Sequence, residues 1–285
     1  MTELSTLSTY TARDGDNLAV QDWPLADHVA PRGVVLLVHG LGEHAGRYEH
    51  VARRLNGQGF LVRGYDQRGH GESGGRRGVL PGDDALLDDL DDVLESTRAR
   101  MPAGAPLVLL GHSMGGLVAA RYVSLNRRPV DALVLSSPAL DPGLSAVQKA
   151  LLAVLPRLAP NLCVGNGLDA DYLSHDPEVV RAYRADPLCH DRISGRLARF
   201  IATAGPAVVA AAPRWRVPTL LMYAGADRLV NPAGSRAFAA AAPAAVVASQ
   251  CYASHYHELF NETPERAEPV FAQLQGWLDA RIPRT

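Results

Sequence analysis

The stretch Gly111-His112-Ser113-Met114-Gly115-Gly116 constrains the fold more than any other part of this sequence. An apolar run at 106–110 comes before it, typical of a strand, and residues 117–122 favour a helix after it. A serine with glycine two positions away on both sides, between a strand and a helix, is the pattern of a nucleophile elbow. The chain must reverse within one residue there, so the serine is strained and its neighbours must be small. We therefore predict that Ser113 is a catalytic nucleophile.

Strand and helix patterns alternate along most of the remaining chain. We predict a hairpin of residues 7–13 and 18–23, strands at 33–39, 60–65, 106–110, 132–136, 218–224 and 244–252, and helices at 46–59, 83–100, 117–122, 232–241 and 264–281. Such alternation predicts an α/β fold, with a mostly parallel eight-stranded sheet covered by helices on both faces.

Residues 139–205 interrupt this rhythm, with no strand pattern, several prolines and two or three helical segments. We interpret them as a helical lid over the carboxyl ends of the strands, where such sheets bind ligands. The core is then formed by residues 1–138 and 206–285. Within the lid, residues 145–155 are apolar on all sides around the single charge of Lys149. That composition is unusual for a surface helix.

Composition narrows the classes of function and partner. The 285 residues are 47% hydrophobic, which is enough for a substantial core. A net charge of −2 without a basic cluster gives no reason to expect a nucleic-acid partner. The cysteines, Cys163, Cys189 and Cys251, are odd in number and widely spaced. We therefore expect reduced thiols and no metal site.

Targeting and membrane signals are absent from the sequence as given. Residues 1–10 lack a basic stretch followed by an apolar one, so we expect no signal peptide. No run approaches the roughly 18 apolar residues of a transmembrane helix. We expect a cytoplasmic protein that is at most peripheral at a membrane.

The predicted helix at 83–100 is unusually acidic. Its carboxylates are Asp83, Asp84, Asp88, Asp89, Asp91, Asp92 and Glu95. One interpretation is a site for a metal or a basic partner, and the other is a solvated helix face beside a buried stripe of leucine and valine. We favour the solvated face.

A serine hydroxyl needs a base at hydrogen-bonding distance, usually a histidine oriented by a carboxylate. In this architecture the acid and the base follow the serine in that order, each on a loop after a later strand. Asp227 follows the strand at 218–224, and both His255 and His257 follow the last strand. We favour His257, because it is the last histidine before the next helix and the Glu258-Leu259-Phe260 that follows can anchor it. The alternative for Asp227 is a turn or helix cap.

The oxygen that becomes negative when an acyl group is attacked needs fixed hydrogen-bond donors. One donor should be the backbone N–H of Met114, directly after the nucleophile. The other should come from the loop after the strand at 33–39, where Leu41 offers its N–H.

These residues resemble the monoacylglycerol lipases and lysophospholipases of the α/β-hydrolase fold, in the larger group that also contains serine aminopeptidases. The resemblance rests on His39-Gly40-Leu41-Gly42-Glu43-His44 with Arg47-Tyr48, Tyr65-Asp66-Gln67-Arg68-Gly69-His70-Gly71-Glu72-Ser73, the elbow, Ser136-Ser137-Pro138, Asp186-Pro187-Leu188, Gly225-Ala226-Asp227 and Tyr256-His257-Glu258. It implies a serine esterase that hydrolyses monoacylglycerols, a class of small lipid ester, to fatty acid and glycerol through an acyl-serine intermediate, with an apolar lid forming an acyl tunnel and no cofactor. Leu41 stands where the family often has a smaller residue.

The resemblance also implies contacts for the polar glycerol end of the substrate. Glu43, Arg47 and His112 are the candidates, and their alternative role is hydrogen bonding and ion pairing within the loops. For Asp66 and Arg68 we favour a structural role in the neighbouring loop.

Other functions fit the same scaffold. One is a lysophospholipase or general carboxylesterase, and another is a non-catalytic ligand receptor. A third is an aminopeptidase, which would hold a free amine with one of the lid acids Asp169, Asp171, Asp176 or Glu178. The apolar lid helix either closes the acyl pocket or also rests on a membrane. Interfacial helices usually carry a basic face. We therefore favour the pocket role, with transient contact at a membrane surface.

Overall fold

A computed structural model describes residues 5–26, 29–143 and 158–283. Its strands are β1 Thr6–Thr11, β2 Asn17–Trp23, β3 Gly33–Val38, β4 Phe60–Tyr65, β5 Leu107–His112, β6 Ala132–Ser136, β7 Cys163–Gly165, β8 Arg192–Ser194, β9 Thr219–Ala224 and β10 Val247–Tyr252. Its α-helices are α1 Glu49–Asn56, α2 Ala85–Arg100, α3 Ser113–Ser124, α5 Pro177–Ala185, α6 Gly195–Ala211, α7 Pro232–Ala241 and α8 Pro264–Arg281. Short 3₁₀ helices are η1 Ala45–Tyr48, η2 Ala170–Tyr172, η3 Ala212–Arg214 and η4 Leu259–Asn261.

The main sheet has eight strands in the order β1-β2-β4-β3-β5-β6-β9-β10. The predicted hairpin is confirmed, since β1 pairs antiparallel with β2 in a register that joins Tyr10 to Leu18. β2 is also antiparallel to β4, and every pairing from β4 to β10 is parallel. The predicted α/β architecture, with a mostly parallel sheet, is therefore confirmed.

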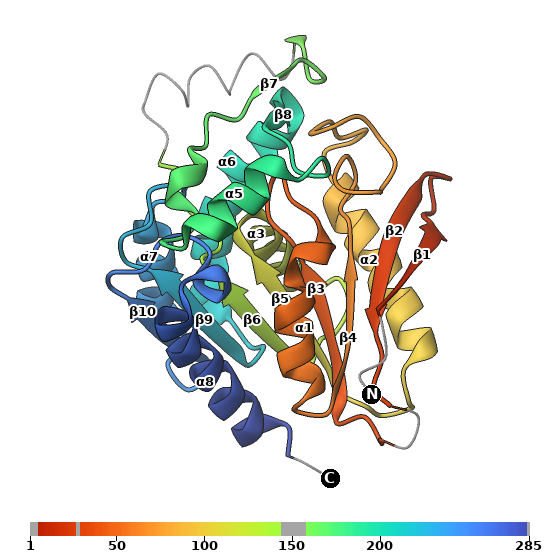
Figure 1. Ribbon diagram of the computed structural model, residues 1–285, viewed down its shortest axis with the longest axis vertical. Coiled ribbons are helices and arrows are strands. Elements are labelled where there is room, and N and C mark those ends of the chain that lie inside the picture. Colours follow the sequence, from red (N-terminus) through yellow and green to blue (C-terminus); the bar gives the residue numbers. More distant parts are fainter. Residues whose placement is uncertain (1–4, 27–28, 144–157, 284–285) are drawn as a thin grey trace.

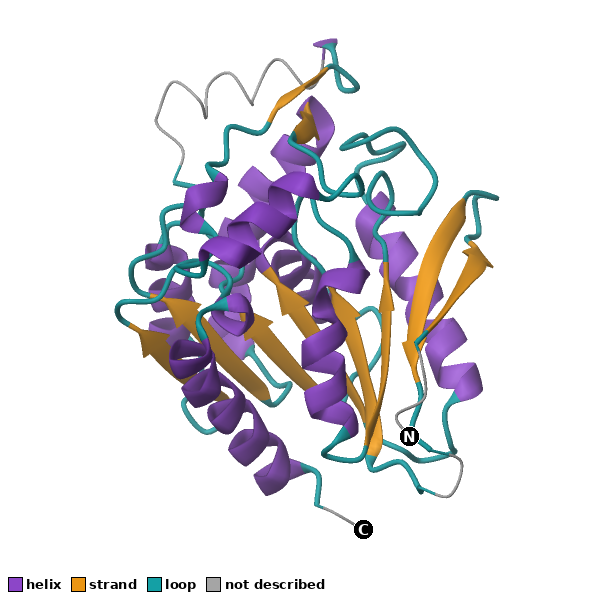
Figure 2. Cartoon of the chain, viewed as in Figure 1, coloured by secondary structure: helices purple, strands orange, loops and turns teal. Residues whose placement is uncertain are grey.

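Helices cover both faces of this sheet (Figure 2). In β3, Leu36 and Val38 belong to the core that packs against α2, α3 and α7, whereas Val35 and Leu37 belong to the core beneath α1 and α8 (Figure 1). Successive side chains of a strand point to opposite faces. A strand buried on both faces is therefore apolar at every position, which explains its continuous apolar run.

The cap, by which we mean residues 158–194, lies at the end of the sheet toward which the arrowheads of the parallel strands point (Figure 1). The expectation of no strand in this region is wrong: β7 and β8 pair antiparallel, with Val164 opposite Ile193. Each is only three residues long, too short for a periodic pattern. The predicted apolar helix at 145–155 lies outside the described residues. The division into core and lid stays a prediction, and α6 runs across its boundary at residue 205.

Other predicted elements differ from the structure at their ends. The helix expected at 46–59 begins as the 3₁₀ helix η1 and continues as α1 to Asn56. The last strand begins at Val247 rather than at residue 244. There the backbone N–H groups of Val246 and Val247 both donate to the carbonyl of Pro243, so the chain turns before it enters the sheet.

The acidic helix α2 differs from the expected solvated face. Asp89 and Asp92 are buried, and they form ion pairs with Arg68 at 2.7 Å and with Arg13 at 2.5 Å respectively. A buried carboxylate is costly unless it is paired, which accounts for these arginines. Part of this acidic face therefore serves to tie α2 to the loops that precede it.

Among the residues that the structure describes, no helix is both long and apolar enough to cross a membrane.

Candidate active site

Ser113 is the first residue of α3 and follows β5 directly. Its φ of +52° lies in the left-handed region that L-residues rarely adopt, so the backbone is strained as expected at an elbow. A β-carbon on Gly115 would overlap the carbonyl oxygens of Val38 and His39. The small residues of the motif thus allow the turn to press against the end of β3.

His257 and Asp227 meet on loops that follow β10 and β9. The distance from His257 Nδ1 to Asp227 Oδ2 is 2.6 Å, and both side chains are buried. The other carboxylate oxygen of Asp227 accepts the backbone N–H groups of Leu229 at 2.8 Å and Val230 at 2.9 Å. The carboxylate is thereby held in one orientation, and it fixes the histidine ring in turn.

The charges of this pair shift both pKa values. Burial is the largest single effect and acts to lower the pKa of His257, but Asp227, together with Glu258 and Glu43, outweighs it and raises that pKa above its usual value. Burial acts to raise the pKa of Asp227, whereas His257 and the two backbone N–H groups lower it, and the net shift is downward. The pair therefore favours an ionised carboxylate beside an imidazole that accepts a proton readily.

The structure places the other candidate histidine elsewhere. His255 Nε2 lies 2.9 Å from the carbonyl oxygen of Arg266 in α8. Of the two histidines that follow β10, His257 is the one that the structure brings to Asp227.

Ser113 and His257 line the same cavity, which has a volume of about 350 Å³. Leu41 and His112 also contribute to its wall. The His112 and His257 rings are 4.7 Å apart between centroids. The structure thus brings Ser113 and His257 from distant parts of the chain to one cavity, with Asp227 hydrogen-bonded to His257 behind it.

Of the two predicted oxyanion donors, Leu41 lines the cavity and Met114 directly follows Ser113 in the chain. Met114 is buried in the first turn of α3, and Leu41 belongs to the loop after β3. The N-terminus of a helix favours a negative oxygen, which suits the N–H of Met114. These two donors stay predictions.

Glu43 is buried and makes several contacts within its own loop. Its Oε1 accepts the N–H of Gly40 at 2.5 Å and the hydroxyl of Tyr48 at 2.7 Å, and its Oε2 contacts Arg47 at 2.5 Å. Burial acts to raise the pKa of Glu43, but Arg47 and other neighbours outweigh it and lower that pKa to about 2. Glu43 is therefore an anion that holds the loop expected to supply the Leu41 donor.

Arg47 links this loop to the one that carries His257. It forms a two-point ion pair with Glu258, at 2.6 and 2.8 Å, as well as its contact with Glu43. Glu258 is directly next to His257, so the anchoring role expected for it has a visible partner. The contacts of Glu43 and Arg47 are those of the alternative, structural role, and the substrate contacts stay predictions.

His112 lines the cavity and directly precedes Ser113 in the chain. Its Nδ1 lies 3.3 Å from Ser136 Oγ. Burial, with a further contribution from His257, lowers the pKa of His112 to about 4. His112 is therefore neutral near pH 7 and can exchange hydrogen bonds without adding charge.

Asp66 and Arg68 are structural, as expected. Asp66 accepts the N–H groups of Ala45 and Glu72, both at 2.8 Å. Arg68 pairs with Asp89 on α2.

The cap contributes residues that the sequence alone did not single out. They include Leu173, Tyr183, Cys189 and His190. No sequence motif marks these residues as part of a site, because they reach the cavity only when the cap packs on the core. Of the acids considered for binding an amine, Asp169 lines the cavity, whereas Asp176 caps α5 by accepting the N–H of Glu178 at 2.9 Å.

One family model and several curated proteins match most of this chain. The family model described as Hydrolase_4, serine aminopeptidase S33, matches residues 29–264. The monoacylglycerol lipase of Mycolicibacterium smegmatis is 39% identical over 261 residues, covering 88% of this chain and 90% of that protein. The monoglyceride lipase of Homo sapiens is 33% identical and covers 94% of this chain and 88% of that protein.

Solved structures agree in fold. The monoacylglycerol lipase of Paleococcus ferrophilus superposes with a TM-score of 0.81 at 33% identity, covering 98% of this chain and all of that one. A soluble variant of the monoglyceride lipase from Saccharomyces cerevisiae gives a TM-score of 0.90 over 100% of this chain and 98% of that one. Because its sequence identity is 24%, this second match shows the fold alone.

Proposed function

Because the chain belongs to the monoacylglycerol lipase family, within the serine aminopeptidase-like group of α/β-hydrolases, we propose that it hydrolyses monoacylglycerols to a fatty acid and glycerol. The observation that supports this activity most is the 2.6 Å contact between His257 and Asp227 at a cavity that Ser113 also lines. A strained serine, an oriented histidine and a buried carboxylate are the parts that acyl transfer needs.

In the first step, His257 Nε2 takes the proton of Ser113 as its oxygen attacks the ester carbonyl. Asp227, hydrogen-bonded to Nδ1, stabilises the imidazolium that forms. The negative oxygen of the tetrahedral intermediate is bound by the backbone N–H groups of Leu41 and Met114. Collapse of the intermediate breaks the bond to glycerol, which leaves with the proton held by His257.

In the second step, water replaces glycerol in the site. His257 takes a proton from this water as it attacks the acyl-serine, and the same two N–H groups bind the new negative oxygen. When the bond to Ser113 breaks, the proton returns to the serine oxygen and the fatty acid is released.

We assign the polar end of the substrate to Glu43 and His112, whose side chains line the cavity. A glycerol hydroxyl can donate to the carboxylate and exchange hydrogen bonds with the neutral imidazole. Arg47 supports this end through its ion pairs with Glu43 and Glu258.

Exposed apolar side chains of the cap support transient contact with a lipid surface. Leu158 is 77% exposed and Leu162 is 60% exposed, with Val164 and Leu168 also exposed nearby. A surface that presents such residues can rest on a membrane and collect a lipid ester from it. Flotation with phosphatidylcholine vesicles tests this part, and a protein that stays at the bottom of the gradient contradicts it.

The proposed activity is tested with a panel of substrates at equal concentration: monoacylglycerols of two chain lengths, a lysophospholipid, a short p-nitrophenyl ester and an amino-acid amide. We expect kcat/KM to be at least about tenfold higher for a monoacylglycerol than for the lysophospholipid or the amide. Ser113→Ala is the control, and its rate gives the background hydrolysis to be subtracted. Faster cleavage of the amide would contradict the proposal and favour the aminopeptidase, in which Asp169 on the cavity wall would hold the amine.

A further inference from the structure

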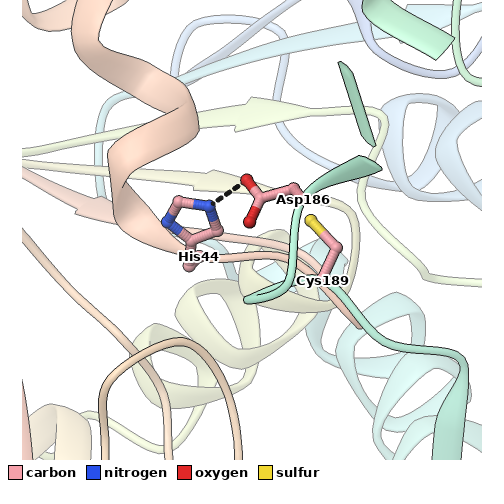
Figure 3. Close-up of side chains that lie close together, drawn as sticks. All are labelled: His44, Asp186 and Cys189. Carbon is pink, nitrogen blue, oxygen red and sulfur yellow. Dashed lines mark hydrogen bonds and ion pairs between the residues drawn. The ribbon is translucent and has the colours of Figure 1, made fainter. Parts of the chain in front are cut away.

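A second cluster of reactive side chains lies where the cap meets the core (Figure 3). His44 comes from the loop after β3, and Asp186 and Cys189 come from the segment after α5. His44 Nε2 and Asp186 Oδ2 are 2.8 Å apart, and one ligand atom of each residue lies within 4.8 Å of the others. All three are half-buried, and Asp186 and Cys189 also line the active-site cavity. The mechanism proposed above uses none of them.

The donor set is the one that zinc prefers in proteins. Zinc takes thiolate, imidazole and carboxylate ligands at about 2.0–2.3 Å, and sites with three protein ligands complete the tetrahedron with water. Ligand atoms around such an ion lie about 3.2–3.8 Å apart. His44 Nε2 and Asp186 Oδ2, at 2.8 Å, are closer than this and would move slightly apart around the ion, while Cys189 Sγ lies within 4.8 Å of a ligand atom of each.

The backbone holds two of the ligands in place. Asp186 Oδ1 accepts the N–H of Leu188 at 2.8 Å, which leaves Oδ2 directed at His44. The N–H of Cys189 donates to the carbonyl of Asp186 at 3.1 Å, so both residues belong to one tight turn. Few degrees of freedom remain to be lost on binding an ion.

The same turn is attached to the core loop that carries His44. The N–H of His190 donates to the carbonyl of Gly42 at 3.0 Å, and the Tyr183 hydroxyl donates to the same carbonyl at 3.2 Å. These contacts hold His44 beside Asp186 and Cys189, and they do not depend on an ion.

We propose that His44, Asp186 and Cys189 bind one divalent ion of the zinc class, with water from the cavity as the fourth ligand. The ion joins the cap to the core at the rim of the active-site cavity. This site is independent of the proposed esterase activity, since it contains none of the three residues of the Ser113–His257–Asp227 set.

The charges around the thiol set the conditions for binding. Zinc binds cysteine as the thiolate, so the ion must displace the thiol proton of Cys189. The neighbouring cation, Arg47, is balanced by its ion pairs with Glu43 and Glu258. Each ion bound therefore releases a proton from the protein.

The test uses Co²⁺, whose bond to a thiolate gives a charge-transfer absorption, as a spectroscopic substitute for Zn²⁺. The parent is the full chain without a histidine tag, carrying Cys163→Ser and Cys251→Ser, so that Cys189 is its one cysteine. We compare it with the same chain carrying Cys189→Ser, His44→Gln or Asp186→Asn, and each variant is first checked for an unchanged circular dichroism spectrum. Zn²⁺ is then added to displace the Co²⁺.

We expect the parent to show the thiolate band with one Co²⁺ bound per chain, and stoichiometric Zn²⁺ to remove it. Cys189→Ser should abolish the band, and His44→Gln and Asp186→Asn should each weaken Co²⁺ binding at least about tenfold. A parent without the band overturns the proposal. A band that is unaffected by both His44→Gln and Asp186→Asn also overturns it, because the thiol would then bind the ion alone. Should Cys189→Ser fail to fold, the other two variants decide the question.

Discussion

Arg47 forms a two-point ion pair with Glu258, the residue that directly follows His257 in the chain. The same guanidinium contacts Glu43, which in turn accepts the N–H of Gly40 in the loop after β3. All these carboxylates are buried. One side chain thus connects the loop proposed to bind the negative oxygen with the loop that carries the proposed base.

The first prediction concerns this connection. Arg47→Gln leaves two buried carboxylates without their cation, and breaking a buried pair in this way costs about 3–5 kcal/mol. We expect a loss of that size in the free energy of unfolding measured with urea, and a lower kcat at temperatures where the variant is folded. Arg47→Lys keeps the charge but loses the two-point geometry, so its loss should be smaller.

Arg54→Gln is the matched control, because Arg54 pairs with Glu268 where both side chains are more than half exposed. Exposed pairs contribute about 0–1 kcal/mol. If Arg47→Gln were no more destabilising than this control, the buried network would have no structural role.

The second prediction concerns the packing of the elbow. A β-carbon at Gly115 would overlap the backbone oxygens of Val38, at the end of β3, and of His39 directly after it, which cannot move without shifting the strand. We expect Gly115→Ala to lower the free energy of unfolding by about 2–3 kcal/mol and to reduce kcat more than about 100-fold.

Gly276→Ala is the matched control for the elbow, since a β-carbon there meets no atom within 4 Å and the residue lies inside α8. Alanine is the better helix former, and we expect this variant to gain about 0.5–1 kcal/mol. Both changes are measured by urea unfolding. A Gly115→Ala enzyme with the activity of the control would contradict the close packing of the elbow on β3.

Much of the fold could be predicted from the sequence because its signals are local. Buried parallel strands such as β3 and β5 are short, continuous apolar runs. The elbow has its own spacing of small residues. The positions of Asp227 and His257 followed from the ends of later strands, because the carboxyl ends of parallel strands meet at one edge of the sheet.

The remaining features depend on contacts between distant parts of the chain. Arg13 and Asp92 are 79 positions apart, and neither residue reveals from its neighbours that it will be paired. The pairing of β7 with β8 and the cap residues on the cavity wall arise only when the cap packs on the core. Periodicity carries no information about such packing.

The third prediction is a dependence of activity on pH. His257 must be neutral to take the proton of Ser113, and its pKa is raised above the usual value of 6.5 because Asp227, with smaller contributions from Glu258 and Glu43, outweighs the effect of burial. We therefore expect kcat/KM to fall as the pH falls through an apparent pKa above 6.5. In Asp227→Asn the carboxylate anion is gone, so this fall in kcat/KM, the acidic limb of the pH profile, should move to lower pH. We also expect kcat to fall by about 10⁴.

The measurement is kcat/KM for a soluble short-chain ester between pH 5 and pH 9, for the wild type and Asp227→Asn. Glu268→Gln is the control, because that exposed carboxylate pairs with Arg54 and takes no part in the Asp227–His257 contact. An acidic limb that stays in place in Asp227→Asn would show that another group controls it.

The most direct test of the central claim is labelling with a fluorophosphonate probe, followed by mass spectrometry of the labelled peptide. Ser113 should carry the probe in the wild type, Ser113→Ala should remain unlabelled, and His257→Ala should react far more slowly, since the serine has then lost its base. Labelling of Ser113→Ala at the wild-type rate, or of His257→Ala as fast as the wild type, would contradict the assignment of Ser113 and His257 as nucleophile and base.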